Sequence, residues 1–152
     1  MFLSDEVRAE ASLTAAAGRL AALASGAAFT RASHAAWNVL TAAAGPVGTL
    51  TAVHCRGPVQ RGAAVTLALR WEAADAAGQR FPALDADITV IPDGERAVLV
   101  GLTGVYRAAP GTRPAQPAAD LAAATGIRTL LTGIAAAVSE PAAPVTGTSA
   151  AG

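Results

Sequence analysis

The alternation of apolar and polar residues predicts strands through the middle of the chain. Residues 65–72, 84–90 and 98–107 place apolar side chains at every second position, the signature of half-buried strands. Residues 7–14 alternate in the same way near the start of the chain. These four segments therefore predict a sheet with one buried and one solvated face.

A fifth segment, residues 49–60, reads as a strand that is interrupted at Gly57 and Pro58. Proline cannot donate a hydrogen bond to a neighbouring strand, so this segment is expected at an edge of the sheet or with a β-bulge.

Helical spacing appears on either side of these strands. Thr14 is a suitable N-cap for a helix over residues 15–25, and Gly26 is a natural stop. A long helix is predicted from about Pro117 to Ser139. Its apolar stripe consists of Ala124, Ile127, Leu131, Ile134 and Val138. Residues 27–48 have no clean period and fit either a short helix or an irregular strand.

The order strand, helix, unassigned segment, several strands and terminal helix predicts an α+β fold. In this arrangement a single antiparallel sheet buries one face under an amphipathic helix. We expect one domain over residues 1–140 and a disordered tail over residues 141–152, because the tail has almost nothing to bury.

Composition narrows the class of protein. The mean hydropathy of +0.42 comes mostly from alanine, and no stretch has the roughly 18 to 20 large apolar residues of a membrane span. Asp5 and Glu6 stand where a signal peptide would be basic and then apolar, so we expect a cytoplasmic protein.

Charge and cysteine content exclude further classes. All 11 basic residues are arginines, a bias typical of a high-GC bacterial genome, and 11 acidic residues balance them. Because the arginines form no cluster, nucleic-acid binding is not expected. Cys55 is the single cysteine, which excludes an intramolecular disulfide and a cysteine metal cage. We expect no metal and no cofactor.

The central strands also resemble a known superfamily. Residues 65–73 (VTLALRWEA), 81–95 (FPALDADITVIPDGE) and 102–111 (LTGVYRAAPG) are similar to the strand core of uncharacterised bacterial members of the SRPBCC superfamily. This superfamily comprises the START-like and polyketide cyclase/dehydrase-like proteins. The resemblance implies a helix-grip fold, in which a curved antiparallel sheet wraps around the C-terminal helix and leaves a cavity between them.

The resemblance and the low aromatic content together point to binding of a hydrophobic small molecule, such as a lipid, a polyketide or an aromatic compound. Trp71 and Tyr106 are the sharpest candidates, since both fall on the inward face near strand ends. A buried tyrosine hydroxyl needs a hydrogen-bond partner, which a ligand could supply. The other candidate lining residues are Leu69, Leu84, Ile88, Leu102, Trp37, His34, Ile127 and Leu131.

Two other functions stay open. A polyketide cyclase or dehydrase reaction in the same cavity could use Tyr106 and His34 as acid–base groups, although no catalytic motif identifies them. Alternatively, the chain is a non-catalytic module that forms a homodimer through a sheet edge or an alanine-rich surface.

Asp85 and Asp87 could suggest a metal site, but the strand period argues against it. Residues two apart on a strand share a face, as do Arg70 and Glu72 on the preceding strand. The opposite face carries the apolar residues and must be buried. We therefore expect the two aspartates on the solvated face, where cross-strand pairs with Arg70 would each contribute about 0.2–1 kcal/mol.

Overall fold

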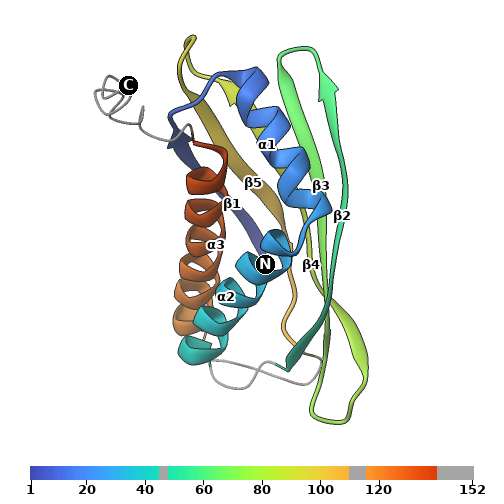
Figure 1. Ribbon diagram of the computed structural model, residues 1–152. Coiled ribbons are helices and arrows are strands. Elements are labelled where there is room, and N and C mark those ends of the chain that lie inside the picture. Colours follow the sequence, from blue (N-terminus) through green and yellow to red (C-terminus); the bar gives the residue numbers. More distant parts are fainter. Residues whose placement is uncertain (45–47, 110–115, 140–152) are drawn as a thin grey trace, which may run out of the picture.

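The computed structural model describes residues 1–44, 48–109 and 116–139 and contains one sheet and three helices (Figure 1). The predicted tail, residues 141–152, lies outside the described residues. The elements in chain order are β1 (Phe2–Ala9), α1 (Leu13–Ser25), α2 (Ala27–Ala44), β2 (Thr49–Arg61), β3 (Ala64–Ala74), β4 (Arg80–Pro92), β5 (Val98–Tyr106) and α3 (Gln116–Val138).

The five strands form one antiparallel sheet in the order β1-β5-β4-β3-β2. The predicted alternation is confirmed in β3, β4 and β5, whose apolar positions are buried while Arg70, Asp85 and Asp87 are exposed. Side chains in register form rows across the buried face. One such row contains Trp71, Leu84 and Tyr106 from β3, β4 and β5.

All three helices lie on the same side of this sheet (Figure 1). Helix α3 packs on α2, β1 and β5, whereas α1 contacts β2 and β4. The long C-terminal helix therefore covers one half of the sheet and α1 covers the other. This arrangement confirms the predicted α+β helix-grip architecture.

Two boundaries near the N-terminus differ from the prediction. The first strand runs from Phe2 to Ala9 rather than over residues 7–14, and it pairs with β5 along its whole length. The N-cap of α1 is Ser12, not Thr14, because the Ser12 hydroxyl accepts a hydrogen bond from the Ala15 backbone N–H at 3.2 Å. The predicted stop at Gly26 is confirmed.

The unassigned segment is mostly helix α2, and its buried stripe has helical spacing. Its fully buried members are Phe29, Ser33, Ala36, Trp37 and Leu40. Ser33 and Ala36 do not stand out as large apolar residues in the sequence, but both are small enough to be buried in the fold.

Helix α3 begins and ends within one residue of the predicted bounds, but its buried stripe differs at one position. Ala124 is exposed, and the buried apolar residues of the helix are Ala122, Ala123, Ile127, Leu130, Leu131, Ile134, Ala135 and Val138. Residues Asp120–Val138 are long and apolar enough to cross a membrane by length and composition. Half of this segment is buried against the rest of the protein, as expected of a core helix.

Strand β2 is an edge strand, as predicted, and its pairing with β3 shifts register at two places. One shift lies between Arg56 and Val59, at the cis Gly57–Pro58 peptide bond. Such irregularities make an edge a poor template for pairing with another chain.

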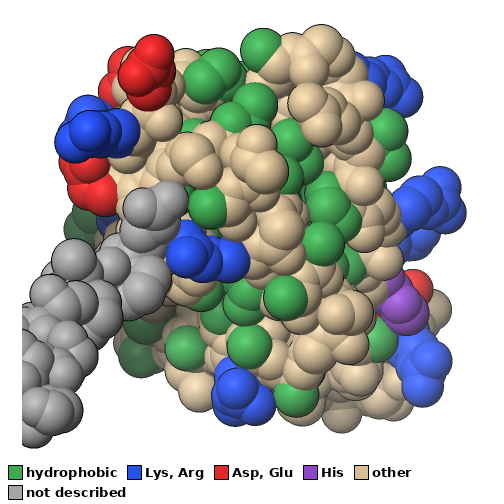
Figure 2. Space-filling view, turned by 45° about the horizontal axis from the view of Figure 1, so that its top comes forward, with side chains coloured by type: hydrophobic (Ala, Val, Ile, Leu, Met, Phe, Trp, Pro, Cys, Tyr) green, Lys and Arg blue, Asp and Glu red, His purple; other side chains and the backbone are tan. Residues whose placement is uncertain are grey.

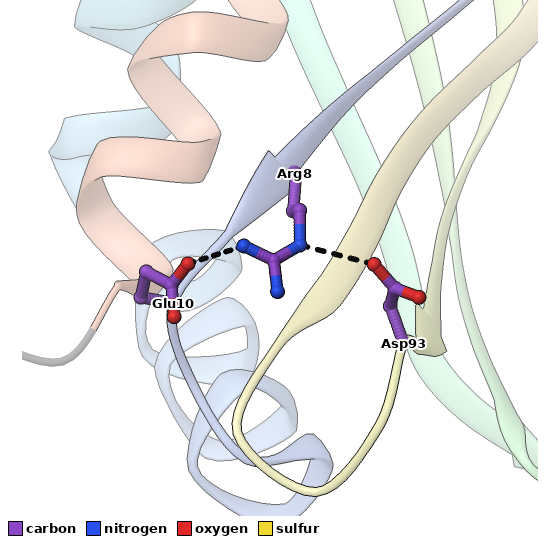
Figure 3. Close-up of polar contacts among 3 residues, drawn as sticks. All are labelled: Arg8, Glu10 and Asp93. Carbon is purple, nitrogen blue, oxygen red and sulfur yellow. Dashed lines mark hydrogen bonds and ion pairs between the residues drawn. The ribbon is translucent and has the colours of Figure 1, made fainter.

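The opposite edge is tied to the β4–β5 turn by exposed ion pairs (Figure 3). Arg8 on β1 donates from Nε to Asp93 at 3.0 Å, and its Nη1 donates to Glu10.

On the face that Figure 2 shows, arginines stand singly and form no basic stripe.

Candidate functional site

Nine of the ten predicted lining residues share one buried core between the sheet and the helices. They are Trp37, Leu69, Trp71, Leu84, Ile88, Leu102, Tyr106, Ile127 and Leu131. Strands β3, β4 and β5 supply six of them, and α2 and α3 supply three. Whether they contact a ligand remains a prediction.

Two indole rings and a serine form the polar part of this core. The rings of Trp37 and Trp71 meet edge to face, with centroids 6.1 Å apart. Trp71 donates from Nε1 to the Ser33 hydroxyl at 3.0 Å, and Trp37 donates from Nε1 to the Gly48 carbonyl at 3.3 Å. Both indole N–H groups therefore have partners within the protein.

Ser33 is the functional candidate that the sequence analysis missed. Among the described residues it is the one polar side chain in the fully buried set, and no solvent reaches it. Ser33 lies four residues after Phe29 and four residues before Trp37. This spacing would have placed Ser33 on the buried side if residues 27–44 had been interpreted as a helix.

Tyr106 differs from the two tryptophans because its polar atom is unsatisfied. The residue is 6% exposed, and its hydroxyl has no hydrogen-bond partner among the described residues. Burial disfavours the tyrosinate and raises the pKa of Tyr106 to about 12. At neutral pH the side chain is thus a protonated hydroxyl, able to donate or accept a hydrogen bond.

The centre of the interior is closed in this structure. Trp71, Leu84 and Leu131 each expose 0% of their surface, whereas Tyr106 and Trp37 expose 6% and 4%. The hollow of about 790 Å³ that the structure shows lies instead on the other face of the sheet, where Arg70 and Asp87 are among its lining residues. Among the described residues, no open cavity therefore borders Trp71, Leu84 or Leu131 in this conformation.

His34 does not belong to this group. It lies on the exposed side of α2, next to the buried Ser33 in sequence but on another face of the helix. It is exposed because residues one apart on a helix point in directions about 100° apart, and its role as a lining residue remains a prediction. The proposed acid–base pair of Tyr106 and His34 is not assembled.

The aspartates occupy the solvated face, as predicted. Asp85 accepts from Arg107 Nη1 at 3.2 Å and lies 3.8 Å from Arg70 Nε. Asp87 has no ion-pair partner among the described residues. Within that part of the chain, no three His, Cys, Asp or Glu residues are grouped so that they could hold a metal ion.

No protein-family model and no curated protein matches this chain. Solved structures with a similar arrangement include one from Thermus thermophilus, at 15% identity and a TM-score of 0.45, covering 91% of this chain and 97% of that one.

Two others carry descriptive names. The Zhui aromatase/cyclase from a Streptomyces species has 10% identity and a TM-score of 0.41, covering 91% of this chain and 93% of its own. A START superfamily protein from Mycobacterium smegmatis has 12% identity and a TM-score of 0.42, covering 90% and 96%. Likenesses this distant carry no argument about function. By its own strand order and the helices on one side of its sheet, this chain has an α+β helix-grip fold.

Proposed function

We propose that the chain binds an uncharged, mostly apolar small molecule between the sheet and the helices, with Tyr106 as its polar anchor. The observation that carries this proposal is the buried Tyr106 hydroxyl without a partner among the described residues. An unsatisfied buried hydroxyl costs about 1–3 kcal/mol, so a ligand that satisfies it gains binding energy there.

The chemistry of the interior limits the class of ligand. A hydroxyl whose pKa is about 12 stays protonated at neutral pH, so it suits a carbonyl, ether or hydroxyl oxygen as acceptor. The fully buried residues in the described part of the chain include no Arg or His. A buried carboxylate would therefore lack a counter-charge, which makes an anionic ligand unfavourable.

Ligand access requires the closed interior to open, and α1 is the element that can move at the lowest cost. Of its residues, Ala16 and Leu20 alone are fully buried. Its tie to α3 is a hydrogen bond from Arg19 Nη1 to the Val138 carbonyl at 3.1 Å. Elements with little buried surface open locally at low free energy. We expect α1 to swing away from α3 when a ligand binds.

The two alternative functions, a cyclase or dehydrase reaction and a homodimeric module, have less support from the geometry. A cyclase or dehydrase reaction would have Tyr106 as its proton donor but no buried base among the described residues, since His34 is exposed. A homodimer through the β2 edge would have to accommodate the register shifts at Gly57 and Pro58. Binding without catalysis therefore fits the geometry best.

Tyr106→Phe tests this proposal through two effects of opposite sign. Without ligand, the free energy of unfolding should rise by about 1 kcal/mol, because an unsatisfied hydroxyl is removed. For a neutral ligand found in a thermal-shift screen of lipids, flavonoids and polyketides, the affinity should fall about two- to tenfold.

Phe29→Leu serves as the control, since it changes a buried ring without touching a hydroxyl. A Tyr106→Phe variant that is less stable than the original protein would mean that the hydroxyl has a partner in the folded chain. An unchanged affinity for every ligand found would remove Tyr106 as the anchor.

A further inference from the structure

The hollow on the solvated face of the sheet has a shape set by strand register. Arg56, Ala68, Asp87 and Thr103 stand in one row across β2, β3, β4 and β5. Ala68 is the short side chain in the middle and forms a floor, while Arg56 and Asp87 line the two sides. Two strand spacings, about 9.5 Å, separate the backbones that carry these opposite charges.

The next row closes one end of the hollow with charges that pair among themselves. Arg70 lies 3.8 Å from Asp85, which also accepts from Arg107 at 3.2 Å. His54 Nε2 lies 3.8 Å from Glu72. Arg70, Arg107 and Asp85 are exposed, and Asp85 pairs with both arginines at this end.

Arg56 and Asp87 are different, because neither side chain has an ion-pair or hydrogen-bond partner among the described residues. They present one positive and one negative group across an apolar floor. A molecule with a single charge could satisfy one of them, whereas a molecule with an ammonium and a carboxylate could satisfy both.

We propose that this hollow binds a small zwitterion, with its carboxylate at Arg56, its ammonium at Asp87 and its carbon chain over Ala68. Amino acids and short peptides have this chemistry. The site lies on the opposite face of the sheet from the interior and does not depend on the function proposed for the interior. Each contact with an exposed charge is weak, so the affinity depends on both being made together.

The test uses a series of amino acids that differ in the spacing of their charges. Glycine, β-alanine, γ-aminobutyrate and ε-aminocaproate are titrated into the ¹⁵N-labelled protein at constant ionic strength, and backbone amide shifts are followed. One chain length should give saturable shifts at Arg56, Ala68 and Asp87. Butyrate and butylammonium, which each carry one charge, should bind about two- to fivefold more weakly.

Variants separate this site from general charge effects. Arg56→Gln and Asp87→Asn should each weaken binding about two- to fivefold. The double exchange Arg56→Asp with Asp87→Arg should retain binding with the ligand reversed. Ala68→Leu should block the hollow. Arg61→Gln, on an exposed arginine near the end of β2, is the matched control and should change nothing.

Three outcomes would overturn the proposal. The first is the absence of a saturable shift at this row for every member of the series. The second is equal affinity for butyrate or butylammonium. The third is binding that survives Ala68→Leu in a variant whose spectrum is otherwise that of the folded protein.

Discussion

At the scale of single residues, the core is defined by which polar groups find a partner. Trp71 and Trp37 both donate within the protein, to Ser33 and to the Gly48 carbonyl. Tyr106 is also buried, but its hydroxyl has no partner among the described residues. This difference, more than the apolar lining, makes the Tyr106 end of the interior the place to look for a ligand.

Ser33→Ala should lower the free energy of unfolding by about 1–3 kcal/mol, because it leaves the buried Trp71 N–H without an acceptor. The measurement is chemical denaturation followed by tryptophan fluorescence. Ser25→Ala is the control, since Ser25 is also helical and its hydroxyl bonds to the Ala22 carbonyl, but it is exposed. Equal effects at the two positions would mean that the buried hydrogen bond adds nothing.

At the scale of elements, small residues decide how closely the helices approach. A Cβ added at Gly126 of α3 would lie 3.2 Å from the Ala36 carbonyl oxygen of α2. At Gly133, on the exposed side of α3, the nearest atom would be 4.0 Å away. A Cβ at Gly126 would therefore crowd the backbone of α2, whereas α3 has room for one at Gly133.

Gly133→Ala should raise the free energy of unfolding by about 0.5–1 kcal/mol, because alanine favours the helix. Gly126→Ala gains the same propensity but crowds α2, so it should be less stable than Gly133→Ala by about 1–3 kcal/mol. Thermal and denaturant unfolding of both variants check this difference. Equal stabilisation would show that α2 and α3 can separate freely.

At the scale of the whole molecule, the burial of the single tyrosine couples stability to high pH. The pKa of Tyr106 is raised to about 12, above its ordinary value of 10.0. Between these values the unfolded chain has lost the proton and the folded chain has kept it. The stabilisation is therefore complete below pH 10 and is lost as the pH rises through about 12.

The free energy of unfolding should thus decrease from about pH 10 to about pH 12, and Tyr106→Phe should remove this part of the decrease. Because the chain has one tyrosine, tyrosinate absorbance reports directly on this group. Burial also raises the pKa of the Cys55 thiol, so Cys55→Ala is the control that should leave the tyrosine-linked decrease in place. An absorbance midpoint near pH 10 in the folded protein would refute the coupling.

The sequence by itself determined the sheet and much of its sidedness. The period of two in β3, β4 and β5 placed Trp71 and Tyr106 inside and Asp85 and Asp87 outside, because successive strand residues must point to opposite faces. The break at Gly57 and Pro58 likewise identified an edge, since proline cannot complete a strand ladder.

Tertiary structure alone decided the rest, because alanine and serine carry little local preference for inside or outside. The buried side of α2, and with it Ser33 in place of His34, follows from which side packs on α3 and the sheet. The closure of the interior, the unpartnered hydroxyl of Tyr106 and the row from Arg56 to Asp87 depend on distances between strands and helices far apart in the chain. A periodic pattern fixes the face on which a side chain lies, but its partner is set by the packing of the whole molecule.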